Sequence, residues 1–150
     1  MSAYKTVVVG TDGSESSFLA VEKAAAIAGD ADAKLIIACA YHPADPKDAG
    51  QAVDALGDEA YQIMGSTPTY EILRTARERA HAAGAKEVLE RAIVGAPVES
   101  LLKLVDEVEA GLLVIGNRGL NTLTGRLLGS VPSDAARKST SDVLIVHTVR

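Results

Sequence analysis

Aromatic side chains are scarce in this chain of 150 residues, where they make up 3% of the sequence and include no Trp. Single-stranded nucleic acids are bound largely by stacking their bases on aromatic rings, so this platform is missing. The formal net charge of −5 also lacks the positive excess that neutralises the phosphates of a nucleic acid. These two shortages exclude nucleic acid as an expected partner.

Cysteine is nearly absent as well. Cys39 is the single one, so no disulfide forms within the chain, which is typical of a reducing compartment. No apolar run approaches the roughly 20 residues of a membrane span, and the N-terminal segment lacks the pattern of a secretion signal. The three histidines do not stand at ligand spacing, so no metal site is expected. We expect a cytoplasmic protein without a membrane partner.

Hydrophobic residues are plentiful, at 47% of the chain, which is enough for the core of one domain over residues 1–150. Short apolar runs alternate with helical patterns, which predicts an α/β fold with a parallel sheet and helices on both faces. Gly29 is expected to end the first helix, and Glu90 and Arg91 place the third strand at an edge. The predicted strands are 5–10, 34–41, 88–94, 112–116 and 143–148. The predicted helices are 14–28, 69–83, a helix that begins at 95–97, and 131–138. Residues 42–67 are expected to form a long loop that holds one helix around 49–62.

Right-handed crossovers make 3-2-1-4-5 the economical order for these five strands. In such an open, doubly wound sheet, ligands bind beyond the carboxyl ends of the strands where the winding reverses. The reversal falls here between the first and fourth strands, which are followed by residues 10–14 (GTDGS) and by the loop that begins at Gly116. We therefore expect a ligand crevice where these two segments meet.

The second segment reads Gly116-Asn117-Arg118-Gly119, then nine residues, then Gly129-Ser130. Glycines without a Cβ allow tight turns and close approach to a ligand. The segment leads into a helix whose free N–H groups and dipole favour a phosphate. Across the crevice, Asp12 would accept hydrogen bonds from ribose hydroxyls or hold a metal ion. A plain turn with a helix cap at residues 12–14 is the alternative.

The spacing G-x2-G-x9-G-[ST] resembles the nucleotide-binding signature of the universal stress protein family. The resemblance extends over nearly the whole chain, through VVVGTDGS, VGAPVESLL, LLVIGNRG and GRLLGSVPSDAARKSTSDVLIVH. It implies a five-stranded open sheet, an adenine nucleotide as ligand and a homodimer formed through the last strands. By position it implies Asp12 at the ribose, Gly10 and Thr11 beside the base or ribose, Cys39 and Ala40 at the adenine edge, Ile115 and Gly116 along the site, and Arg118, Gly119, Gly129, Ser130 and Val131 near the phosphate.

Three functions stay open. The chain lacks G-x4-G-K-[ST] and an evident base for activating water, which predicts a nucleotide sensor or buffer without catalytic residues. A weak Mg²⁺-dependent ATPase or phosphotransferase is the alternative, and an interaction module that needs no nucleotide is a third reading. The resemblance implies either ATP, with which the glycine signature is associated, or cyclic AMP, because mycobacterial-type single-domain members include cyclic AMP binders. An acidic protein favours cyclic AMP slightly, since it carries one negative charge and ATP about four.

Overall fold

The computed structural model describes residues 3–41, 67–117 and 130–148. Five parallel strands form one sheet in the order β3-β2-β1-β4-β5, which confirms the predicted fold class and strand order. The elements in chain order are β1 (Thr6–Gly10), α1 (Glu15–Ala31), β2 (Lys34–Tyr41), α4 (Thr67–Ala82), β3 (Glu87–Val94), α5 (Pro97–Val108), β4 (Leu112–Gly116), α6 (Ser130–Lys138) and β5 (Asp142–Val146).

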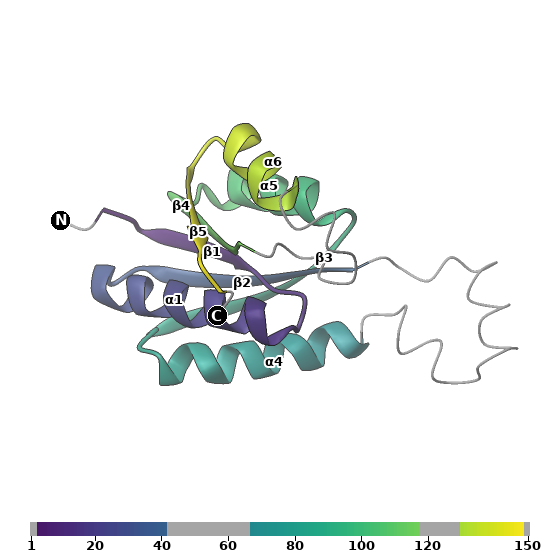
Figure 1. Ribbon diagram of the computed structural model, residues 1–150. Helices are drawn as coiled ribbons and strands as arrows, with labels where there is room; N and C mark the ends of the chain where they lie inside the picture. Colours follow the sequence, from purple (N-terminus) through teal and green to yellow (C-terminus); the bar gives the residue numbers. More distant parts are fainter. Residues whose placement is uncertain (1–2, 42–66, 118–129, 149–150) are drawn as a thin grey trace, which may run out of the picture.

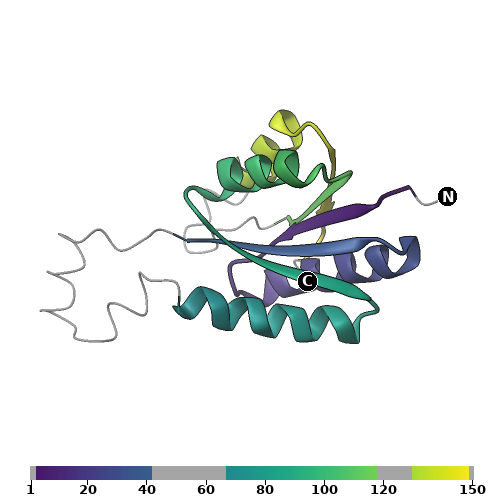
Figure 2. The same ribbon diagram turned by 180° about the vertical axis from the view of Figure 1, so that it is seen from behind.

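The helices cover the sheet from both sides. Helices α1 and α4 lie on one face and α5 and α6 on the other, as Figures 1 and 2 show from opposite directions. The central strands therefore have no solvent face, which is why their sequences are continuous apolar runs. Within the part of the chain that the structure describes, no helix has the length and apolar character needed to cross a bilayer.

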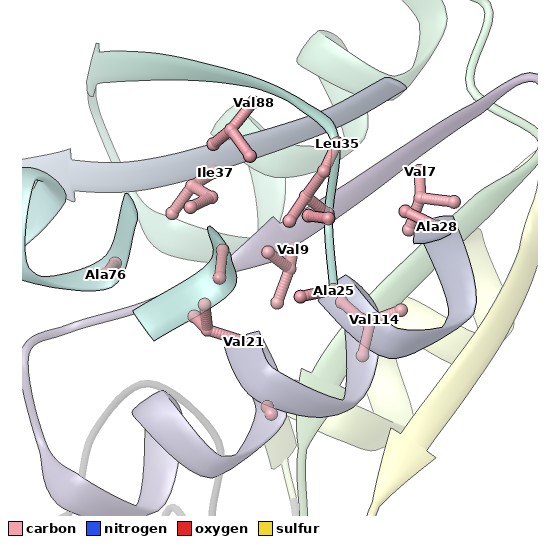
Figure 3. Close-up of a cluster of buried hydrophobic side chains, with 14 of the residues drawn as sticks. Val7, Val9, Val21, Ala25, Ala28, Leu35, Ile37, Ala76, Val88 and Val114 are labelled. Carbon is pink, nitrogen blue, oxygen red and sulfur yellow. The ribbon is translucent and has the colours of Figure 1, made fainter. Parts of the chain in front are cut away.

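The larger hydrophobic core lies between the sheet and the pair α1 and α4 (Figure 3). Val9 and Ile37 point from the strands toward Val21 and Ala25 of α1, and all four side chains are fully buried. Each large aliphatic side chain removed from water in this way contributes about 1.5–3 kcal/mol to folding. A second core on the opposite face is formed by Val8, Ile36, Ala38, Leu101, Leu104, Val105, Ala110, Leu113, Ile115 and Ala135.

Gly29 does not end the first helix, so that prediction was wrong. Helix α1 continues to Ala31, and Asp32 takes the left-handed cap conformation with φ 57°. Gly29 serves a different purpose, because a Cβ at this position would stand 2.4 Å from the carbonyl oxygen of Gly84. The missing side chain lets the turn after α4 approach α1 closely.

The prediction was more accurate for one edge strand of the sheet than for the other. Strand β3 lies at one edge, as Glu90 and Arg91 predicted. Strand β5, at the other edge, begins one residue earlier than predicted and ends at Val146, so His147 and Thr148 lie beyond it. The expected helix around 49–62 falls within residues 42–66, outside the described residues.

Candidate functional site

Strands β1 and β4 separate before the strand pairs on either side of them do. The β1–β4 pairing ends at Val9 and Val114, whereas the β1–β2 pairing runs on to Gly10. The β4–β5 pairing likewise continues to Gly116. The sheet thus divides at the predicted reversal of winding, which we call the switch point: the carboxyl ends of β1 and β4 with the segments that follow them.

Two buried hydroxyl groups organise the loop after β1. The Oγ1 of Thr11 and the Oγ of Ser17 lie 2.7 Å apart, and both residues are almost fully buried. The Ser17 hydroxyl donates to the carbonyl of Ser14 at 2.9 Å, so Thr11 donates to Ser17. In return, the Gly13 amide donates to Thr11 at 3.1 Å and the Asp12 amide donates to Ser17 at 3.3 Å. This connected set of bonds fixes the backbone on both sides of the Asp12 side chain.

Asp12 and Ser14 complete the same loop from its exposed side. The Ser14 amide donates to Oδ1 of Asp12 at 2.9 Å, and the Ser14 side chain caps α1 by accepting from the Ser17 amide. This is the turn-and-cap arrangement that the sequence left open as an alternative. It uses the amides of residues 12–14 internally, so they are not available to an anion. Among the described residues, Oδ2 of Asp12 has no hydrogen-bond partner and is available to a ligand hydroxyl.

Gly13 lets helix α4 pack directly on this loop. Its φ of +86° is a left-handed conformation that few residues other than glycine adopt. A Cβ there would also lie 2.8 Å from the side chain of Ile72 in α4. The backbone conformation therefore favours glycine between Asp12 and Ser14, and the approach of the Ile72 side chain adds to this preference.

The end of β2 presents a backbone edge to the switch point. Thr11 donates its amide to the carbonyl of Ala38 at 2.9 Å, which shows that the peptide groups of Ala38 face β1. Successive residues of a strand point their peptide groups to opposite sides, so Ala40 faces the same side as Ala38. Strand β1 ends at Gly10, and the described residues provide no backbone partner for Ala40 on that side. Its N–H and C=O offer one donor and one acceptor there.

Cys39 lies in the core beneath this edge, with 3% of its surface exposed. Burial raises the pKa of its thiol to about 11, and the nearby Asp12 carboxylate adds to that effect, while a hydrogen bond with Thr69 opposes it. The thiol is therefore protonated at neutral pH and is a poor nucleophile. Cys39 belongs to the core, and its peptide groups face β3, so the backbone groups that this part of β2 offers to a ligand are those of Ala40.

Two predicted site residues on β4 are buried. Ile115 is fully buried in the core beneath α5, so its side chain is not available to a ligand. Gly116 is buried beside the end of the chain, where a Cβ would lie 3.4 Å from a methyl carbon of Thr148. The contacts of both residues with a ligand stay a prediction, and Ile115 is paired with β5 through Ile145.

The sequence did not reveal the role of Asn117. Its Oδ1 accepts from the Thr148 amide at 2.8 Å and from the Thr148 hydroxyl at 2.9 Å. The Asn117 amide donates to the carbonyl of Val146 at 2.7 Å. Asn117 thus fixes the segment after β4 to the segment after β5. An asparagine after a buried strand is a weak signal, because it is also a common turn residue.

Helix α6 begins at Ser130, as predicted to within one residue. Ser130 and Val131 therefore contribute first-turn amides, which have no partner within the helix and favour an anion. The remaining predicted residues Arg118, Gly119 and Gly129 lie within 118–129, outside the described residues.

The comparisons with known proteins show the family of the chain. The model of the universal stress protein family matches residues 3–147. The chain belongs to this family. Universal stress protein Rv1636 of Mycobacterium tuberculosis is 64% identical over 148 residues, which cover 99% of each chain.

Two solved structures are similar along the whole chain. One is a universal stress protein in complex with cAMP, with 54% identity, a TM-score of 0.76 and coverage of 99% of this chain and 100% of that one. The other is the crystal structure of Rv1636 from Mycobacterium tuberculosis, with 57% identity, a TM-score of 0.62 and coverage of 99% of both chains.

Replacing Ser17 with alanine tests the hydroxyl network. The Ser17→Ala variant leaves the Asp12 amide and the Thr11 hydroxyl without their partner, so we expect the free energy of unfolding to fall by about 1–3 kcal/mol. Urea denaturation measures this change. The control Ser133→Ala removes an exposed hydroxyl from α6 and should stay within about 0.5 kcal/mol of the parent. Equal stability of both variants would contradict the role assigned to Ser17.

Proposed function

We propose that this universal stress protein binds an adenine nucleotide at the switch point and acts as a sensor or buffer, with a slight preference for cyclic AMP over ATP. The observation that carries the proposal is the position of two ligand-binding groups. The backbone edge of Ala40 lies on β2 just past the last pair with β1, and Asp12 follows β1, the strand that separates from β4. A relative that is 54% identical over nearly the whole chain was solved with cAMP, which supports the same ligand class.

The backbone of Ala40 suits adenine. Adenine presents an acceptor at N1 and a donor at its 6-amino group, and these match one N–H and one C=O on the same strand edge. With the sugar held at Asp12, guanine would present a carbonyl and an N–H in the reverse order. Such a mismatch leaves buried polar groups unpaired, which gives strong discrimination between ligands.

The phosphate would bind at the start of α6. The loop after β1 uses its own amides internally, so the first-turn amides at Ser130 and Val131 supply the anion-binding groups in the described residues. One helix N-terminus satisfies one phosphate well. Cyclic AMP brings one negative charge to a protein whose net charge is −5, whereas ATP brings about four. This difference supports the preference for cyclic AMP.

Binding without turnover is supported by the groups near the switch point. Cys39 is a protonated core thiol, and Asp12 already holds the Ser14 amide with one oxygen. The sequence has no P-loop lysine to neutralise the outer phosphates of ATP. A weak Mg²⁺-dependent ATPase remains the alternative from a different class, in which Mg²⁺ would neutralise these phosphates instead.

Calorimetric titration with cyclic AMP, ATP and cyclic GMP tests the proposal. The Asp12→Asn variant keeps an oxygen for the Ser14 amide but loses the carboxylate that would accept from the ribose. We expect it to weaken cyclic AMP binding by about tenfold, because hydrogen bonds to charged groups are worth about 1.5–3 kcal/mol. Asp30→Ala removes the same charge from an exposed position on α1 and should leave the affinity unchanged.

Four results would contradict parts of this proposal. Wild-type affinity in Asp12→Asn would remove Asp12 from the site. Tight binding of ATP beside undetectable binding of cyclic AMP would reverse the preference. Phosphate release from ATP and Mg²⁺ that disappears in Asp12→Ala would favour the ATPase, and the absence of a thermal shift with any adenine compound would favour an interaction module.

We further propose that the protein acts as a cytoplasmic homodimer joined through β5. This strand is an edge of the sheet, and Ile145 on it is 40% exposed. Light scattering after gel filtration should give a dimer mass for the wild type and a lower mass for Ile145→Asp. Leu89→Asp is the matched control, since Leu89 is similarly exposed on the opposite edge strand β3. If Leu89→Asp dissociates the dimer and Ile145→Asp does not, the interface lies at β3 and the proposal is contradicted.

A further inference from the structure

Thr148 connects the two sides of the switch point. It follows the end of β5 and is 6% exposed. Its hydroxyl donates to Oδ1 of Asn117 at 2.9 Å, so the hydroxyl of Ser16, which is also hydrogen-bonded to Thr148, donates to it. The amide of Thr148 donates to the same Asn117 oxygen at 2.8 Å. Both sides of the Thr148 hydroxyl are thus occupied.

The two partners of Thr148 belong to opposite sides of the proposed nucleotide site. Ser16 lies in the first turn of α1, directly after the loop that carries Asp12. Asn117 follows the last residue of β4 and precedes the segment that leads to α6. Figure 1 shows the end of β5, in yellow, reaching the first turns of α1, in purple.

Thr148 also fills the space between these segments. A Cβ on Gly116 would lie 3.4 Å from the Cγ2 of Thr148 and 3.8 Å from the carbonyl oxygen of Ser16. The strand pairing between β1 and β4 has already ended at Val9 and Val114. Beyond Val9 and Val114, and among the described residues, the Thr148 side chain is hydrogen-bonded both to the start of α1 and to the residue that follows β4.

We propose that Thr148 is a positioning residue for nucleotide binding, because the Ser16–Thr148–Asn117 chain of hydrogen bonds sets the spacing between the Asp12 loop and the segment after β4. This inference rests on the proposed function. A site whose parts are held in place before the ligand arrives loses less entropy on binding. The same bonds make the affinity of the site depend on residues at the end of β5.

The variant Thr148→Val separates this role from simple packing. Valine keeps the shape and the methyl group beside Gly116 but loses the hydroxyl, so both hydroxyl bonds are broken. Thr148→Ser is the matched control, because it keeps the hydroxyl. We expect the Kd for cyclic AMP to rise about five- to tenfold in Thr148→Val, the equivalent of one lost hydrogen bond, and to change less than about twofold in Thr148→Ser.

Thermal unfolding of the same variants distinguishes positioning from stability. A merely structural role would lower the Tm of Thr148→Val and leave its Kd at the wild-type value at a temperature well below the transition. That result would overturn the inference. A raised Kd that Thr148→Ser does not reproduce supports it.

Amide hydrogen exchange without nucleotide keeps the test independent of the proposed function. In Thr148→Val the amides of residues 12–14 should exchange about tenfold faster, because local opening becomes easier, while the core amides of β2 keep their rates. If the wild type binds no adenine nucleotide, the proposed function fails. Hydrogen exchange then tests by itself whether the Ser16–Thr148–Asn117 chain of hydrogen bonds holds the loop after β1. Faster exchange then supports the role of Thr148 in holding the loop, and unchanged exchange overturns it.

Discussion

The separation of β1 from β4 is the constraint on which the rest of this structure depends. The chain winds outward from β1 in one direction and from β4 in the other, so α1 covers one face of the sheet and α6 the opposite face. The helices that follow the two strands therefore lie on opposite faces of the sheet. The groups around the point where β1 and β4 separate are consequently left at strand and helix ends, where backbone donors and acceptors have no regular partner.

The two sides of the switch point differ in whether their backbone amides already have hydrogen-bond partners. In the loop after β1, Thr11, Ser17 and Asp12 accept hydrogen bonds from the amides. The start of α6 instead presents amides that the helix cannot satisfy. On the proposed function, the first side would therefore recognise the sugar through a fixed carboxylate, and the second would hold the phosphate.

On the proposed function, a third group of contacts would come from the backbone of β2. A small residue, Ala40, next to the last residue of that strand would suit recognition by peptide groups rather than by a side chain. Cys39 beside it faces the core and is kept neutral by burial. The site thus relies on the ends of regular elements, with a carboxylate as its one charged group among the described side chains named above.

Much of the fold was predictable because its signals are local. The runs at β1, β2 and β4 are apolar at successive positions, which indicates strands buried on both faces, and the charges of β3 indicate an edge. Gly29 was misread because a glycine that ends a helix and one that allows a close approach look the same in sequence. The end of β5 was misread because Thr148 is β-branched like Val146, and its bonds with Asn117 and Ser16 join residues far apart in the chain. The start of α6 was predicted to within one residue, and Asp12 stays a predicted ribose contact from its position after a strand. The Thr11–Ser17 pair carries no signal that distinguishes it from ordinary polar residues.

The most direct test of the switch point as the binding site is a map of backbone amide chemical shifts as cyclic AMP is added to the isotope-labelled protein. The account predicts that the largest changes occur at Gly10, Ala40 and Ser130, which lie on three separate elements around the division between β1 and β4. Changes confined to the surface pocket between β3 and α5, lined by Val94, Ser100 and Lys103, with those three amides unaffected, would contradict it.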